Sequence, residues 1–155
     1  MKRDEVIIKL KKYFSISELV DETVFAKHGE RAWRFFDTDL LECLLIVREG
    51  LNKPITINTW VWGGRFSQRG LRHNLSPMVK SKSRLYLSAH MLGKAIDFDV
   101  KGMSATQVRT WIKSNPELFA CKIRLEENLR GKEINWVHLD TIHEEKNPKI
   151  YLFDV

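Results

Sequence analysis

Residues 88–99 constrain the fold of this chain more than any other stretch. Within residues 95–100 the even positions are apolar and the odd positions are Ala or Asp. This period of two predicts a strand with one buried face and with Asp97 on the opposite face. His90 precedes the strand, and Gly93 between them permits a sharp backbone turn. Imidazole and carboxylate are ligand types that zinc prefers, so His90 and Asp97 are candidate metal ligands.

A hairpin downstream offers a third ligand. Residues 121–126 and 134–141 each alternate in polarity, which predicts two strands joined by a loop of about six residues. If their apolar faces share one core, His138 and Glu126 share the opposite face. They would then be direct or diagonal cross-strand neighbours, with Cβ atoms about 5–8 Å apart. We therefore expect His138 as the third ligand and Glu126 as the general base for a water at an open fourth position.

Several nearby residues have alternative interpretations. Glu127 has the wrong parity for the site unless a bulge intervenes, and Glu133 in the predicted loop is a weaker candidate for the base. Asp99 and Asp140 lie on the correct face, where they could orient ligands or bind arginine. Trp136 is better suited to forming a wall of the site than to acting chemically. Spacing alone leaves both the metal site and a purely structural role open.

The remaining pattern predicts helices and further strands. Residues 37–51 form the clearest helix, with an N-cap at its start and Gly50 in the position of a C-cap. A strand is expected over residues 54–60 and an edge strand over 150–155. Ser104 begins another helix, because Gln107 three residues later completes a capping box.

Composition limits the class of protein. Of the 155 residues, 43% are apolar and no segment has low complexity, so a single folded domain is expected rather than a disordered chain. No apolar run is long enough for a membrane span. Acidic residues at positions 4 and 5 do not suit a signal peptide, so we expect no autonomous secretion and a cytoplasmic location. Cys43 and Cys121 fit two buried free thiols, with a disulfide as the alternative.

The charge is compatible with an anionic partner. The net charge is +6, which suits a nucleic acid, an anionic membrane or an anionic wall polymer. The basic residues are spread along the chain, and no compact nucleic-acid-binding motif is present. Nucleic acid is therefore not the expected partner, and we expect a monomer.

Two motifs in this chain resemble those of a known enzyme family. The D-alanyl-D-alanine metallopeptidases of bacterial cell walls, which include phage endolysins, have a signature similar to Ser88-x-His90-x-x-Gly93-x-Ala95-x-Asp97. Their second motif is similar to Trp136-x-His138. The resemblance covers residues 37–141. It leaves residues 1–36 as an accessory N-terminal segment and residues 142–155 as a C-terminal tail or edge strand of the same domain, 1–155.

The resemblance implies a fold, a cofactor and a set of site residues. The fold would be the α+β fold that the family shares with hedgehog signalling domains, a central antiparallel sheet with helices packed on one face. Zn²⁺ would be bound by His90, Asp97 and His138. Ser88 would contact substrate or hold the ligand turn. The family also keeps substrate-binding arginine and glutamine in an upstream segment, which corresponds here to residues 60–72; the candidates for substrate binding are Arg65, Gln68, Arg69 and Arg72, with Trp136 beside them.

One position departs from the commonest family pattern. Many members have the catalytic glutamate three residues before the last histidine, where this chain has Asn135, which cannot accept a proton. Others, including the hedgehog branch, have a glutamate on the preceding strand, which fits Glu126. The implied activity is hydrolysis of amide bonds in peptidoglycan stem peptides, as a D-Ala-D-Ala carboxypeptidase or an L-Ala-D-Glu endopeptidase. The alternative is a non-catalytic zinc-binding module of the same fold that binds a wall peptide or a protein.

Overall fold

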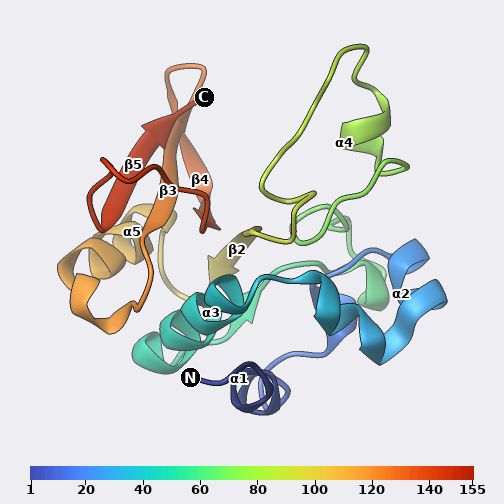
Figure 1. The fold of residues 1–155 in the computed structure, drawn as a ribbon, viewed down its shortest axis with the longest axis horizontal. Helices are drawn as coiled ribbons and strands as arrows, with labels where there is room; N and C mark the ends of the chain where they lie inside the picture. The colour runs from blue at the N-terminus through green and yellow to red at the C-terminus, as the bar shows by residue number, and fades with distance from the viewer.

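Five strands form one mixed sheet in the order β1-β2-β4-β3-β5 (Figure 1). The computed structural model describes residues 1–155. The strands are β1 (Ile55–Thr56), β2 (Ala95–Val100), β3 (Ile123–Leu129), β4 (Lys132–Asp140) and β5 (Ile150–Asp154). Neighbouring strands are antiparallel except β3 and β5, which are parallel. The α+β class is confirmed, but the expected antiparallel sheet is mixed. β4 ends beside the start of β3, and residues 141–149 lead to the other edge of β3, where β5 runs parallel to it.

The chain also contains five helices. They are α1 (Arg3–Leu10), α2 (Glu22–His28), α3 (Thr38–Leu51), α4 (Pro77–Lys80) and α5 (Ala105–Ser114), with short 3-10 turns between them. The Asp37 carboxylate accepts hydrogen bonds from the first backbone N–H groups of α3, and Ser104 caps α5 in the predicted capping box. None of the helices combines the length and apolar character needed to cross a bilayer.

Two predicted strand boundaries and one predicted helix cap were wrong for identifiable reasons. The hairpin loop is a two-residue turn, because Arg130 and Gly131 both adopt positive φ, as a tight primed hairpin turn requires. The strand predicted over 54–60 ends at Thr56, where the chain leaves the sheet to bond with the N-terminal segment. Helix α3 ends at Leu51, as predicted, but its C-cap is a left-handed Asn52 rather than Gly50, whose missing side chain instead admits the Trp111 ring.

The hydrophobic core lies on the apolar face of the sheet. Ile96, Leu139 and Leu125 form one cross-strand row on that face, and α5 packs against β4 and β2. A single continuous cluster of 29 buried apolar side chains runs from Val6 to Leu139. Residues 1–36, expected as an accessory segment, supply many members of this cluster, so they are a structural layer of the same core.

The two cysteines are close in space. Cys43 is buried and Cys121 is half-buried, both are free thiols, and their Sγ atoms lie 3.6 Å apart. The expected free thiols are therefore present as a contacting pair that joins α3 to the start of β3.

Gly93 fixes the approach to β2. Its φ is +65°, and a Cβ atom at this position would lie 1.9 Å from the Phe35 carbonyl oxygen. The turn between His90 and β2 therefore needs glycine for its backbone conformation and also for its contact with the N-terminal segment.

We predict that Gly93→Ala lowers the free energy of unfolding by about 2–4 kcal/mol, because left-handed strain and overpacking add together. Gly102→Ala is the matched control, since Gly102 also has positive φ but has no neighbour within 4 Å of the place that a Cβ atom would occupy. It should cost about 1 kcal/mol. Urea unfolding of both variants measures the difference, and equal losses would contradict the role of the Phe35 contact.

Candidate metal centre

Two of the predicted metal ligands and the predicted base lie in one row across the sheet. Asp97 on β2 is directly opposite His138 on β4, and His138 is directly opposite Glu126 on β3. The three side chains share the polar face of the sheet, because residues in register on neighbouring strands project to the same side. The predicted pairing of Glu126 with His138 is thus confirmed as direct.

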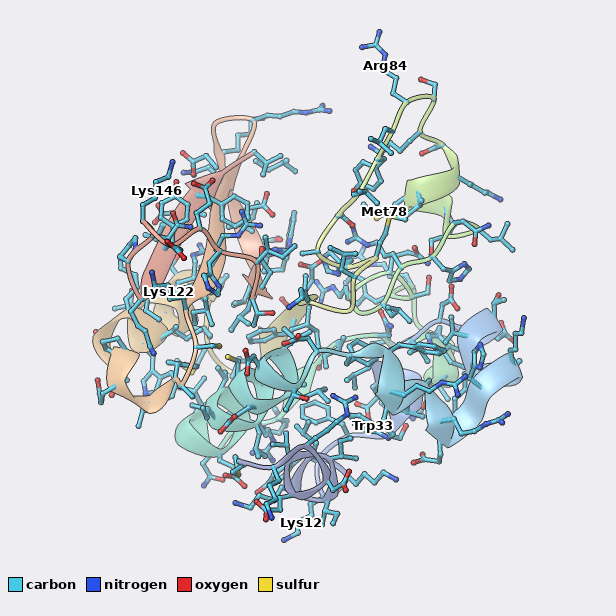
Figure 2. The ribbon with its side chains drawn as sticks, viewed as in Figure 1. Lys12, Trp33, Met78, Arg84, Lys122 and Lys146 are labelled. Atoms are coloured by element: carbon cyan, nitrogen blue, oxygen red, sulfur yellow. The ribbon has the colours of Figure 1, made fainter.

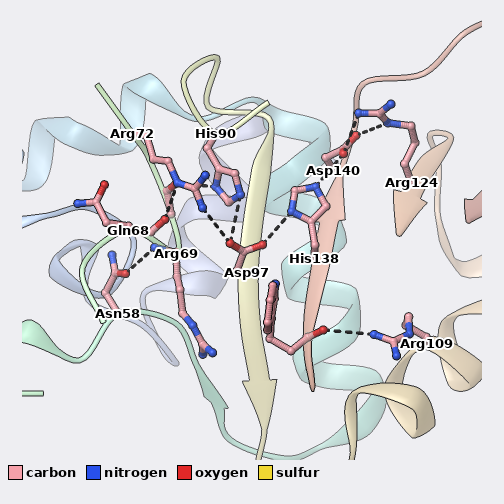
Figure 3. Close-up of polar contacts among 12 residues, drawn as sticks. Asn58, Gln68, Arg69, Arg72, His90, Asp97, Arg109, Arg124, His138 and Asp140 are labelled. Carbon is pink, nitrogen blue, oxygen red and sulfur yellow. Dashed lines mark hydrogen bonds and ion pairs between the residues drawn. The ribbon is translucent and has the colours of Figure 1, made fainter. Parts of the chain in front are cut away.

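His90, Asp97 and His138 form a compact buried group. Their potential ligand atoms all lie within 4.8 Å of one another. The three residues are only 3%, 7% and 8% exposed, respectively. Figure 3 shows the Asp97 carboxylate between the two imidazoles, with His138 Nδ1 2.8 Å from one oxygen and His90 Nε2 3.3 Å from the other. Two nitrogens and a carboxylate converging in this way could hold a metal ion.

His90 is oriented by the backbone. Its Nδ1 lies 2.8 Å from the Gly70 carbonyl oxygen, which can accept a hydrogen bond from Nδ1–H. Nε2 is then the ring nitrogen directed at the Asp97 side of the cluster, where a neutral ring could bind a metal ion. A ligand histidine whose other nitrogen is held by a carbonyl is the usual arrangement in metal sites, because the second bond fixes the tautomer and the ring orientation.

His138 is held between two carboxylates. Nδ1 faces Asp97, and Nε2 lies 2.9 Å from Asp140 Oδ2. Asp140 is fully buried, and Arg124 from β3 grips it with two hydrogen bonds of 2.8 and 3.0 Å. Of the two roles considered for Asp140, orienting a ligand and binding arginine, the geometry supports both. Arg124, Asp140 and His138 form one continuous chain of polar contacts.

The electrostatics of the group favour a cation. Burial alone would raise the pKa of Asp97, but the charges and hydrogen bonds of His90 and His138 hold that pKa far below its usual value. Burial alone would lower the pKa of His138. The hydrogen bonds to Asp140 and Asp97 outweigh the effect of burial and raise that pKa to about 9. In the metal-free site this raised pKa favours a proton on His138. A metal ion would have to displace that proton, as ligand histidines bind metals in the neutral form.

Glu126 lies beside this group without being part of it. It lines the same cavity of about 610 Å³ as His90, Asp97 and His138. Burial raises the pKa of Glu126, while the charge of His138 lowers it and that of Asp97 raises it. Unlike Asp97 and Asp140, it is not engaged by an arginine. A half-buried carboxylate free of an ion pair can accept a proton from a water in this cavity.

The competing candidates for the base lie elsewhere. A β-bulge does occur in β3, between Glu126 and Asn128, yet Glu127 does not line the cavity. Glu133 forms an ion pair with Arg109 at 2.9 Å. Asn135 is exposed and also lies outside the cavity lining. Glu126 is therefore the one of these residues that faces the cluster.

The three upstream arginines, which the sequence did not separate, have different surroundings. Arg72 is buried and its Nη2 lies 3.2 Å from Asp97 Oδ2. Arg69 forms an ion pair of 2.6 Å with Asp99 and stacks on the Phe66 ring. Arg65 is exposed and pairs with no carboxylate. Arg72 is thus a direct neighbour of the candidate ligands, whereas Arg65 retains a guanidinium available to a ligand.

A second cavity adjoins the first at Asp97. It has a volume of about 270 Å³, includes Arg65, Gln68 and Arg69 in its lining, and shares Arg72 and Trp136 with the larger cavity. The structure therefore gathers the proposed substrate-binding residues around the ligand cluster.

Two of these residues have unsatisfied polar atoms. Ser88 Oγ, in the larger cavity, and Gln68 Oε1, in the smaller one, are buried without a hydrogen-bond partner. Buried polar atoms are usually paired, so these two are suited to bonding with a bound molecule.

Sequence reasoning missed the segment that holds the cluster together. The Arg69 carbonyl accepts a 2.7 Å hydrogen bond from the Asp97 N–H, and the Gly70 carbonyl faces His90. Asn58, which is fully buried, accepts a 3.0 Å hydrogen bond from the Arg69 N–H and donates to the Val20 carbonyl at 3.2 Å. The one available signal was the polar amide of Asn58 between Ile57 and Thr59 in the predicted strand.

Comparisons of this chain with protein-family models, with curated proteins and with solved structures found no match.

We predict that His138→Ala lowers the affinity for Zn²⁺ by more than about 100-fold, because it removes one of three ligands. Mutation of residues that only orient a metal ligand already lowers metal affinity by up to about 100-fold. His143→Ala removes a histidine outside the cluster and should leave the affinity unchanged. Titration with a competing metal indicator measures both. Full zinc occupancy in His138→Ala would show that the ligand set is wrong.

Asn58→Ala should weaken zinc binding by about 10–100-fold, because residues 69–70, which hold Asp97 and His90, would lose their anchor. Asn115→Ala is the control, since the Asn115 amide bonds to the Trp111 carbonyl at the end of α5. Both variants should lose stability in urea unfolding. Only Asn58→Ala should change the affinity for zinc or the visible spectrum of the cobalt-substituted protein. If both variants changed them equally, Asn58 would have only a general structural role.

Proposed function

We propose that this protein is a zinc-dependent peptidase that hydrolyses amide bonds in peptidoglycan stem peptides. The observation that carries the proposal is the row Asp97–His138–Glu126, with His90 completing the buried ligand group beside it. Three ligands and one unpaired glutamate are the components of a catalytic zinc site, which keeps a coordination position open. The resemblance of both motifs to the cell-wall metallopeptidases supports this proposal, as does the α+β fold with the polar face of the sheet at the site.

The roles divide among residues of this chain. Bound zinc supplies Lewis-acid activation of water and of a substrate carbonyl. Glu126 takes the proton from the attacking water and delivers it to the departing amine. Arg124 and Asp140 hold His138 in one orientation, and the Gly70 carbonyl does the same for His90. Burial opposes ionisation of Asp97, but His90 and His138, with Arg72 beside them, keep its pKa low, so the carboxylate stays ionised and available as a ligand at neutral pH.

The polar residues around the second cavity suit a peptide substrate. The Arg65 guanidinium can pair with a substrate carboxylate, and Gln68 Oε1 can accept from an amide N–H. Ser88 Oγ can bond to the substrate from the other side of the cluster. We propose these three contacts as the ones that place the scissile amide over His90, Asp97 and His138.

We predict that Glu126→Gln keeps zinc but lowers kcat for a synthetic stem peptide by about 10²–10⁴-fold, the range for loss of a general base. Glu133→Gln, which changes a glutamate outside the cavity, should retain activity. Amine release is measured alongside the metal content of each protein. A chelator should abolish hydrolysis, and added Zn²⁺ should restore it.

A different result would favour the alternative function. Wild-type protein that binds zinc and the stem peptide but never releases an amine would be a non-catalytic binding module. Full activity in Glu126→Gln would leave the peptidase in place and assign the base to another group.

A further inference from the structure

The larger cavity lies between two projecting segments. In Figure 1 the loop that contains α4 rises on the right, and the β3–β4 hairpin of the sheet rises on the left. Met78, Tyr86 and Leu87 from the loop line the cavity, and Leu129, Trp136 and Phe153 line it from the sheet. Figure 2 shows Met78 on the loop that stands beside this opening. The ligand cluster with Glu126 forms the floor of the same cavity.

The walls of this cavity are apolar and uncovered. Leu87 is 68% exposed, Met78 48% and Leu129 38%. Isolated exposed apolar side chains are common on protein surfaces, but these converge from different segments on one hollow beside a candidate active site. Apolar lining with a few convergent polar groups is the usual composition of a small-molecule binding site.

The loop wall is loosely attached to the rest of the chain. The backbone hydrogen bonds of residues 79–82 are made within the loop, to Ser76 and Val79. The apolar side chains of the loop therefore gain little from contacts with the core. A bound apolar group between the two walls would remove surface of both from water, which stabilises the complex in proportion to the area covered.

The two cavities meet at Asp97 and share Arg72, Met78 and Trp136. The smaller one adds Arg65, Gln68 and Arg69, whereas the larger one adds leucine and further aromatic side chains. We infer that the larger cavity contains a subsite for a bulky aliphatic or aromatic group of the substrate, outside the part of the site lined by Arg65 and Arg69. This assignment rests on the proposed function of the site and extends it to the kind of substrate.

The inference concerns the chemical class of the flanking group. A cavity of about 610 Å³ is much larger than the methyl group of an alanine residue needs. The preferred substrate would carry a leucine- or phenylalanine-sized side chain next to the scissile amide, or a fatty acyl chain attached near it. Both present the same apolar surface to Leu87 and Leu129.

Binding of an apolar dye tests the subsite without any hydrolysis. Anilinonaphthalene sulfonate should bind the folded, zinc-loaded protein, and Leu87→Ser or Leu129→Ser should each weaken binding about fivefold, because each variant replaces apolar contact surface. Leu85→Ser is the matched control, since Leu85 lies two residues from Leu87, is 92% exposed and is outside the cavity lining. No dye binding, or equal weakening by all three variants, overturns the subsite.

Substrate competition tests the same inference in the reaction. Three model stem peptides would carry alanine, leucine or phenylalanine beside the scissile bond, and a fourth would be the alanine peptide with an octanoyl chain. A kcat/KM at least about tenfold higher for the bulky side chains, or for the acyl chain, supports the subsite and identifies the source of the apolar group. Leu87→Ser and Leu129→Ser should remove the preference, and Leu85→Ser should retain it. Equal kcat/KM for all four peptides would overturn the subsite but not the peptidase function. No hydrolysis of any peptide would contradict the proposed function, and the dye experiment would then decide whether the subsite exists.

Discussion

The candidate site depends on the register between β2, β4 and β3. In that register Asp97, His138 and Glu126 form one row, and Ile96, Leu139 and Leu125 form the next row on the other face. A shift of one residue in either pairing would exchange the two faces, placing the ligands in the core and the leucines in the cavity. Core packing therefore fixes the geometry of the site, because the same alternation that buries the apolar row determines which polar groups meet.

Placing these groups on a buried face creates an electrostatic problem that two arginines address. Asp97 and Asp140 are both buried, and an unpaired buried carboxylate would be strongly destabilising. Arg72 pairs with the first and Arg124 with the second. The imidazole of His138 lies between the two carboxylates and completes the network. The two carboxylates and the two arginines therefore balance one another in charge.

The parts of the site that the sequence predicted are those set by local pattern. Polarity alternation placed Asp97, His138 and Glu126 on one face, and the glycine between His90 and β2 indicated the turn. The separation of Arg65, Arg69 and Arg72 could not be predicted, because it depends on which of them meets Asp97 across a long irregular segment. The tight hairpin was missed for a different reason, since an arginine at positive φ is uncommon and gives little turn signal. The parallel attachment of β5 is a tertiary property that strand patterning does not encode.

The N-terminal segment shows how far a metal site can depend on residues that carry no ligand. Glu18, Leu19 and Val20 provide backbone carbonyls that accept hydrogen bonds from Asn58 and Leu71. Gly70 approaches Leu19 so closely that a Cβ atom would lie 1.8 Å from its carbonyl oxygen. The same Gly70 faces His90 through its own carbonyl, so the contact with Leu19 and the orientation of the ligand belong to one short piece of backbone. Residues outside the motif-bearing region therefore help to define the geometry of the cluster, and they do so through backbone contacts, which sequence motifs do not record.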